Sequence, residues 1–181
     1  VTSLRAMFKD SPLVEVDTSS WDTSNVIYMQ NMFGGASLAN PDTSNWDTGQ
    51  VQTMRYMFYR ATAANPDTSN WDTSNVTSMA YMFRQAEAAT PNTTGWQVSN
   101  VTDMSYMFSL APMLNPDVSS WNTANVETLE GMFQGAVLAN PDVANWETGS
   151  VTKMEKLFDG ASVATPNTSS WSTENVETMA M

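Results

Sequence analysis

Hydrophobic side chains recur along this chain at a fixed interval of 25 residues. All seven Trp residues and all seven Phe residues keep this interval, and Val opens every interval from Val1 to Val176. Met fills most of two further columns, which begin at Leu4 and Met7. A strict period without insertions indicates that every repeat forms the same structural unit, which buries its apolar face only against its neighbours.

The period makes the chain a single repeat domain of seven full copies and a remainder. The copies are residues 1–25, 26–50, 51–75, 76–100, 101–125, 126–150 and 151–175, and residues 176–181 begin another. Twenty-five residues are too few for an independent domain without metals or disulfides. Because Val1 already stands inside the repeat, we expect the chain to be an excerpt from a longer array. Below, a position is a residue's place within its repeat.

The first half of each repeat carries a helical pattern. In residues 76–86, apolar side chains occupy the first, fourth, seventh, eighth and eleventh places, which is the spacing of one helical face. Residue types that cap helices precede this segment, and glycine follows it in some repeats, as at Gly160. The sequence therefore predicts one short helix per repeat, of about two to three turns.

The second half of each repeat carries strand signals. Pro stands at position 16 in six of the seven repeats, and it favours extended backbone before its ring. Position 18 holds Thr or Val, which have similar shapes and both favour strands. We predict a short parallel strand at about residues 67–71 and its equivalents, with Trp71 facing inward. The chain would be an α/β solenoid of leucine-rich-repeat type, with one short parallel strand and one short helix per turn.

The segment 67–86, DTSNWDTSNVTSMAYMFRQA, resembles the repeat of BspA-like surface proteins. That 25-residue unit of leucine-rich-repeat type is common in bacterial surface proteins and mycoplasma lipoproteins. The resemblance covers every copy, and Trp71, Val76 and Phe83 stand where that pattern has them. It departs at two places, where this chain has mostly Ala and Thr instead of the family's frequent Phe and Ile. The resemblance implies an extracellular or cell-surface protein used for attachment, and it implies no catalytic residue.

Composition narrows the class of partner. The net charge is −12 and only seven residues are Lys or Arg, so nucleic acid and anionic membrane surfaces are not expected partners. The chain has no Cys and no His, which removes thiolate chemistry, the commonest general base and the commonest metal ligand. Carboxylate pairs recur along the array, whereas a catalytic pair is normally unique. We expect no enzyme, and no apolar run is long enough for membrane insertion.

The charges are divided between the two halves of the repeat. All seven basic residues fall at positions 3–10, whereas positions 12–24 carry twelve acidic residues and no basic residue. The most regular acidic column, at position 17, contains Asp17, Asp42, Asp67, Asp117 and Asp142. Each Asp could accept hydrogen bonds in an Asx turn of its own repeat. Alternatively, the column could contact a partner or bind a divalent cation such as Ca²⁺. The metal is unknown, and no other cofactor is expected.

Aromatic columns are expected to form most of the core. They comprise Trp21, Trp46, Trp71, Trp96, Trp121, Trp146 and Trp171, with Phe33, Phe58, Phe83, Phe108, Phe133 and Phe158. An exposed Trp ladder that binds glycans is the alternative for the first set. A better candidate for a partly exposed aromatic patch is the column of Tyr56, Tyr81 and Tyr106.

These features lead to two function hypotheses of different classes. The main hypothesis is a non-catalytic cell-surface or secreted module for adhesion, which binds protein or glycan partners. The alternative is a structural stalk or filament that self-associates end to end through the open ends of the solenoid. A Ca²⁺-stabilised array and ice binding are minor alternatives. Ice binding would use the Thr ladder of Thr23, Thr48, Thr73, Thr123, Thr148 and Thr173.

Overall fold

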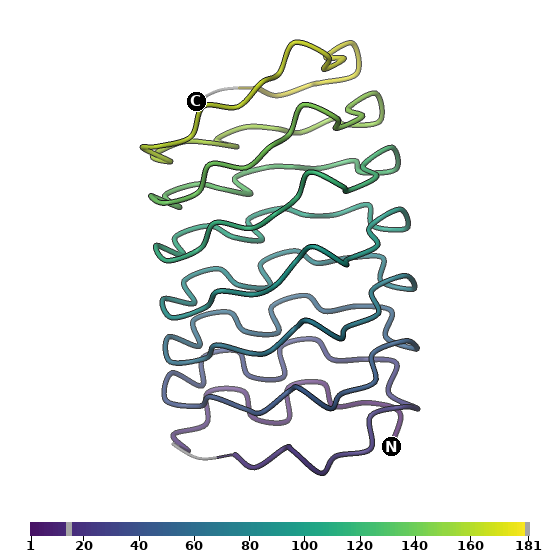
Figure 1. The fold of residues 1–181 in the computed structure, drawn as a ribbon, viewed down its shortest axis with the longest axis vertical. Helices are drawn as coiled ribbons and strands as arrows, with labels where there is room; N and C mark the ends of the chain where they lie inside the picture. Colours follow the sequence, from purple (N-terminus) through teal and green to yellow (C-terminus); the bar gives the residue numbers. More distant parts are fainter. Residues whose placement is uncertain (14–15, 180–181) are drawn as a thin grey trace.

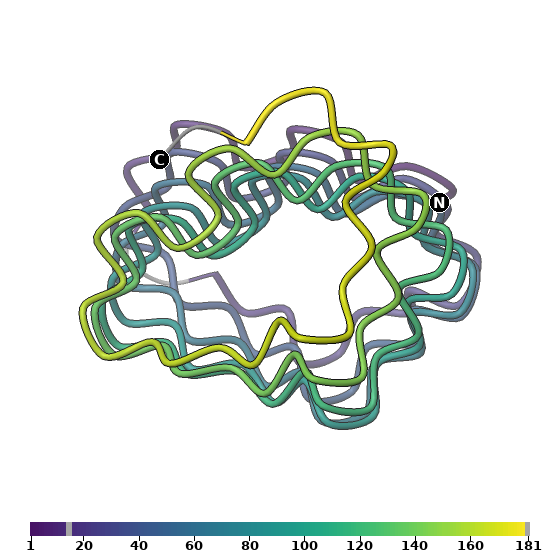
Figure 2. The same ribbon diagram turned by 90° about the horizontal axis from the view of Figure 1, so that it is seen from above.

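The chain winds into a stack of coils, with one repeat in each coil (Figure 1). The structure is a computed structural model that describes residues 1–13 and 16–179. Viewed along the stack, successive coils overlie one another as oval rings (Figure 2). We number them coil 1 to coil 7, from residues 1–25 to residues 151–175. Equivalent positions of neighbouring coils therefore form columns that run along the stack.

The predicted α/β solenoid of leucine-rich-repeat type is wrong. Residues 1–13 and 16–179 contain no helix and no extended strand, and none of them forms a helix that could span a membrane. The regular pairing consists of isolated parallel bridges between neighbouring coils, all at position 3. The bridged residues are Ser3, Tyr28, Thr53, Ser78, Asp103, Thr128, Lys153 and Thr178. The bridges lie where the helix was predicted, and not in the strand predicted at residues 67–71.

Successive β-turns take the place of the helix at positions 4–11. In coil 3, the N–H of Met57 donates to the C=O of Met54 at 3.1 Å, which closes a turn within the coil. The N–H of the preceding residue, Tyr56, donates to the C=O of Ala80 in the next coil at 3.0 Å. An α-helix needs each of these amides for a carbonyl four residues earlier in the same segment. Since alternate amides bond along the stack, the helix cannot form.

Left-handed backbone at positions 6 and 10 produces these turns. The φ angles are 57° at Tyr56, 61° at Tyr81 and 53° at Tyr106, and 57° at Arg60. A positive φ at the third residue is what a type II turn requires, and it interrupts a right-handed helix. Because linked turns also bring residues three or four places apart to one side, they give the apolar spacing that predicted a helix.

The predicted strand is replaced by two copies of one five-residue turn. In coil 3 these are DTSNW at 67–71 and, continuing into coil 4, DTSNV at 72–76. The N–H of Ser69 donates to Oδ1 of Asp67 at 3.0 Å, and the equivalent bond in the second copy is 2.9 Å. The N–H of the fifth residue donates to the Thr carbonyl at 3.2 and 3.0 Å. The chain therefore bends every five residues, which prevents a strand.

Columns of like side chains fill the interior. Trp rings of neighbouring coils stack with centroids 6.2–6.5 Å apart, and Phe rings stack at 5.2–6.2 Å. Trp46 and Phe58 are buried, whereas Trp21, Trp171 and Phe158 of the first and last coils are only partly buried. Each large buried side chain contributes about 1.5–3 kcal/mol. This contribution depends on the neighbouring coils, which supply the covering rings.

Thr side chains at positions 18 and 23 are buried and join the coils. Thr43 donates its hydroxyl to the backbone C=O of Asp67 at 2.6 Å, and Thr48 donates to that of Asp72 at 2.9 Å. The ladder at position 23 lines the interior from Thr23 to Thr148. It therefore presents no flat exposed surface on which ice could be ordered.

Candidate functional site

The acidic column at position 17 lies on the outer surface and is bonded within its own turns. Every carboxylate of the column accepts a hydrogen bond from the backbone N–H two residues later, at 3.0–3.1 Å. The acceptors are Asp17, Asp42, Asp67, Asp117 and Asp142. Asn92 and Asn167 accept the same bond at 3.2 Å. Because Asn serves as well as Asp, this turn requires an acceptor oxygen and not a negative charge.

These hydrogen bonds also lower the pKa of Asp17, Asp42, Asp67 and Asp117. Ser69 donates its hydroxyl to Asp67 at 2.7 Å, in addition to its amide. The side-chain bond first and the backbone bond second lower the pKa of Asp67. The same two causes lower the pKa of Asp17 and Asp42. The carboxylates of the column are thus exposed and bonded to their own coil, and the two bonds favour the ionised form of Asp17, Asp42 and Asp67.

The acidic column does not assemble a metal centre within the described residues. No group of three or more Asp, Glu, His or Cys side chains there is placed to hold a metal ion. Ca²⁺ takes six to eight oxygen ligands, whereas a coil contributes at most one position-17 carboxylate, which already accepts a bond from its own turn. Ca²⁺ binding along this column would need most of its ligands from water or from a partner.

Positions 3–10 carry a row of stacked Tyr rings on the outer surface, which we call the Tyr row. It consists of Tyr56, Tyr81 and Tyr106, and all three side chains are partly exposed. The first two rings have centroids 4.6 Å apart with planes inclined by 11°. The second and third rings are 5.1 Å apart with planes inclined by 24°. Adjacent coils therefore hold three rings in a fixed stack with their edges open to solvent.

Guanidinium groups lie over this row. The Arg84 guanidinium carbon is 5.5 Å from the Tyr81 ring centre and 4.9 Å from that of Tyr106. The Arg55 guanidinium is 5.8 Å from the ring centre of Tyr56. Each such contact contributes about 0.5–1 kcal/mol at an exposed site. The row therefore combines aromatic area with positive charge in one fixed arrangement.

Tyr106 ends the row on the side of coil 6. Its hydroxyl donates to Glu130 at 2.6 Å. A Cβ on Gly131, whose φ is 57°, would lie 2.3 Å from the Tyr106 ring, so a larger residue there would displace the ring from this placement. Burial first, and the bond to Glu130 second, raise the pKa of Tyr106 to about 12. Burial also raises the pKa of Tyr81.

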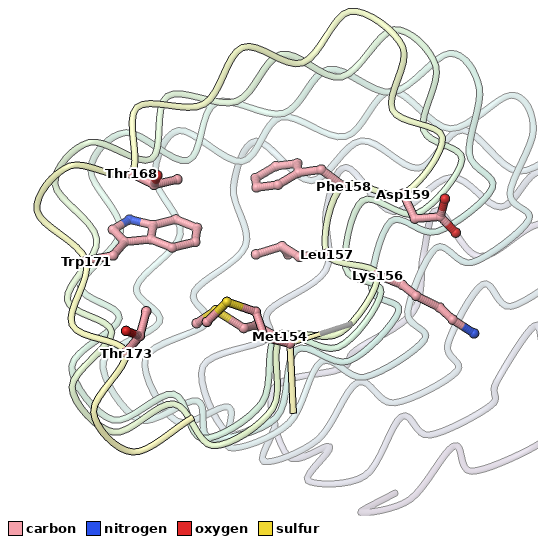
Figure 3. A pocket seen from close by; sticks show the side chains of 9 residues that line it. Met154, Lys156, Leu157, Phe158, Asp159, Thr168, Trp171 and Thr173 are labelled. Carbon is pink, nitrogen blue, oxygen red and sulfur yellow. The ribbon is translucent and has the colours of Figure 1, made fainter. Parts of the chain in front are cut away.

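An apolar hollow of about 300 Å³ lies over coil 7 at the end of the stack. Figure 3 shows Leu157, Phe158 and Trp171 pointing into its centre, whereas Lys156 and Asp159 point away from it. The three inward residues belong to core columns of the repeat. We therefore interpret this hollow as the end face of the core.

The Arg residues beside the Tyr row are the part of this surface that the sequence did not identify. The Tyr column was visible as a column, but Arg55, Arg60 and Arg84 were seen only as members of a basic half-repeat. The available signal was the stretch RYMFYR at 55–60, where two Arg residues flank two Tyr residues. Whether these Arg and Tyr side chains share one surface depends on the backbone conformation, because a helix would distribute the six side chains around its axis.

Comparison with known proteins identifies the family. The model of a family described as "Mycoplasma protein of unknown function, DUF285" matches residues 1–96 and 87–181, which together span the chain. No curated protein and no solved structure matches the chain. The two matches in tandem agree with the array of 25-residue repeats. The chain belongs to this Mycoplasma repeat family.

Proposed function

We propose that this chain is a non-catalytic binding module of a BspA-like surface protein, and that it attaches to protein or glycan partners outside the cell. Membership of the Mycoplasma repeat family supports a role as a repeat module. The resemblance of the segment 67–86 to BspA-like repeats supports the surface location. The lack of His and Cys supports a non-catalytic role, because the chain then lacks the usual general base and thiol nucleophile.

The Tyr row with its Arg residues carries the proposal. Tyr and Arg are the residue types most often found at the energetic centres of protein interfaces. Here the rings of Tyr56, Tyr81 and Tyr106 are stacked before any partner arrives. Side chains that are already ordered lose less conformational entropy on binding. The acidic column is a weaker candidate, because its carboxylates already accept hydrogen bonds from their own coils.

Binding of the purified chain to an array of matrix proteins and glycans tests the proposal. We expect at least one specific partner, whose affinity falls about tenfold or more in the double variant Tyr81→Asn/Arg84→Gln. Asn suits position 6, since Asn31 occupies it with a φ of 57°. The matched control is Asp67→Asn/Asp72→Asn, which changes two charges on the acidic half and should bind normally. A chain that binds nothing on the array would refute the proposal.

A further inference from the structure

The Tyr row stops at Tyr56, and the surface of the preceding coil is hollowed. Coil 2 carries Asn31 and Gly34 at the positions where coil 3 carries Tyr56 and Tyr59. Two adjoining hollows of about 500 and 250 Å³ lie over it. Both are lined by Lys9, Asn31 and Tyr56. Small side chains in one coil thus leave a recess between the larger side chains of its neighbours.

Two aromatic rings line this recess on the side of coil 3. Tyr56 stacks on Tyr81 through one face and contributes to the lining of both hollows. Tyr59 lines the smaller hollow, and its ring is perpendicular to that of Tyr56 with the centroids 5.7 Å apart. Two rings at a right angle form an apolar corner. The C–H face of a saccharide ring can pack into such a corner as apolar groups do against aromatic faces.

Positive charge surrounds the same recess. Arg5, Lys9 and Arg55 line the larger hollow, and Lys9 and Arg60 line the smaller one. The carboxylate in this lining is Asp10, 3.9 Å from Lys9 in an exposed ion pair. Arg55 is also 4.0 Å from Asp103. Four cationic groups and one carboxylate therefore line the recess in a chain whose net charge is −12.

The charge of positions 3–10 changes along the stack. Coils 1–4 carry five basic residues and one acidic residue at these positions, whereas coils 5–7 carry two basic and four acidic residues. The recess lies within the basic part. A local excess of cations beside low-dielectric protein attracts anions and concentrates them. The recess thus lies in the part of this surface that attracts an anionic group.

Among the described residues, Gln30 carries an unpaired hydrogen-bond acceptor beside the larger hollow. Gln30 lines that hollow, and its buried Oε1 has no hydrogen-bond partner among the residues that the structure describes. An unsatisfied acceptor is costly. This oxygen is closed off from solvent, so a saccharide hydroxyl could donate to it once the Gln30 side chain rotates toward the hollow, whereas a bare sulfate or carboxylate has no hydrogen to donate.

We infer that the recess over coil 2 binds a saccharide that carries sulfate or carboxylate groups. The sugar ring packs against Tyr56 and Tyr59, the anionic groups meet Lys9 and Arg60, and a hydroxyl donates to Gln30. This inference rests on the proposed function, for which it names the class of ligand. The proposed binding site lies at one end of the Tyr row, where coil 2 has smaller residues than coil 3, and does not extend along the whole array.

Titration calorimetry with three probes tests the ligand class. The probes are a heparin-derived hexasaccharide, which carries sulfate, sialyllactose, which carries a carboxylate, and neutral lactose. The wild-type chain should bind one or both anionic probes and should not bind lactose. The anionic probe that binds shows whether the ligand's charged group is a sulfate or a carboxylate. Affinity should fall as salt is added, because exposed charge pairs are screened.

Matched variants locate the site. Lys9→Gln/Arg60→Gln should weaken binding by about tenfold or more, since charged hydrogen bonds are lost. Lys153→Gln/Lys156→Asn removes the same charge from coil 7 and should bind as the wild type does. Asn31→Tyr should extend the Tyr row by one ring and fill the recess. It should abolish binding without lowering the melting temperature, because coils 3–5 already hold Tyr at this position.

Any of three outcomes would overturn the inference: neither anionic probe binds, the two charge variants lose affinity equally, or Asn31→Tyr binds as the wild type does. If protein or glycan partners on the array bind in spite of such an outcome, the proposed function stands and only the site is wrong. If the chain binds nothing on the array and none of the probes, both are wrong.

Discussion

Single residues in this chain are selected for the hydrogen bonds they make to backbone as much as for their size. At position 17 Asp and Asn are interchangeable, since either supplies the oxygen that accepts the N–H two residues later. At positions 18 and 23 Thr gives way to Val in three places, Val98, Val118 and Val143, which are equally buried. These positions therefore require a buried side chain, and where the residue is Thr its hydroxyl adds a hydrogen bond to the next coil.

Asp67 tests the role of the Asx turn. Asp67→Asn should leave the melting temperature nearly unchanged at neutral pH, because the acceptor oxygen remains. Asp67→Ala should lower it, since the N–H and hydroxyl of Ser69 lose their acceptor. Thermal unfolding of both variants measures the difference. Equal melting temperatures for the two variants would show that the turn holds without its acceptor.

The same bonds predict a loss of stability in acid. The pKa of Asp17, Asp42, Asp67 and Asp117 is lower in the folded chain than the ordinary value of 3.8. Their ionised form is therefore favoured by folding. This contribution is present above pH 3.8 and is lost as pH falls through the folded pKa values. Urea unfolding at a series of acidic pH values should show the decline. An unchanged midpoint would argue against the Asx bonds.

Tyr106 predicts an effect at the alkaline end. Its pKa is raised from 10.0 to about 12 in the folded chain, so folding favours the neutral phenol. This contribution is complete below pH 10 and is lost as pH rises toward 12. An ultraviolet titration should find one phenol that ionises last. Glu130→Gln should lower its pKa, because a neighbouring negative charge is removed. A Tyr106 phenol that titrates with the others would contradict its placement.

The structural element of this protein is a turn and not a helix or a strand. The turns at positions 4–11 use backbone amides alternately within a coil and to the next coil, whereas the five-residue turns bond within the coil through the backbone and to the next coil through Thr hydroxyls. A stack of such turns satisfies backbone groups that an isolated coil would leave unpaired. Neighbouring coils are thus required for hydrogen bonding as well as for burial.

Position 6 tests the left-handed backbone on which the turns depend. Tyr81 has a φ of 61°. Tyr81→Val should destabilise the chain by about 1–2 kcal/mol more than Tyr81→Asn, since a β-branched residue tolerates this conformation poorly. Both variants lose the ring, so their difference isolates the backbone. Urea unfolding provides the free energies. Equal stability of the two variants would mean that the backbone here is not left-handed.

At the scale of the molecule, the period predicts the repeating columns but not the conformation that carries them. Apolar residues three or four places apart are shared by a helix and by linked turns, so that pattern alone could not decide between them. Two signals favoured turns. Glycine recurs at position 10, as in Gly35 and Gly135, which indicates left-handed backbone. The four-residue sequence DTSN, whose residue types favour turns, also occurs twice in succession, at 67–70 and 72–75.

The candidate site was predictable only in part for the same reason. The column of Tyr56, Tyr81 and Tyr106 follows from the period alone. The placement of Arg84 over two of these rings could not be predicted from the period, because the turns set the direction of the side chain at position 9. The recess over coil 2 follows from a comparison between coils, in which Asn31 and Gly34 are small where their neighbours are large.

The central claim is that partners bind at positions 3–10 of the coils and not on the acidic half. Hydrogen–deuterium exchange of the chain, with and without a partner found on the array, tests it most directly. We expect new protection in the segments that carry the Tyr row and the recess, namely residues 28–35, 53–60, 78–85 and 103–110. Protection confined to the acidic turns, such as residues 65–75, would contradict the claim.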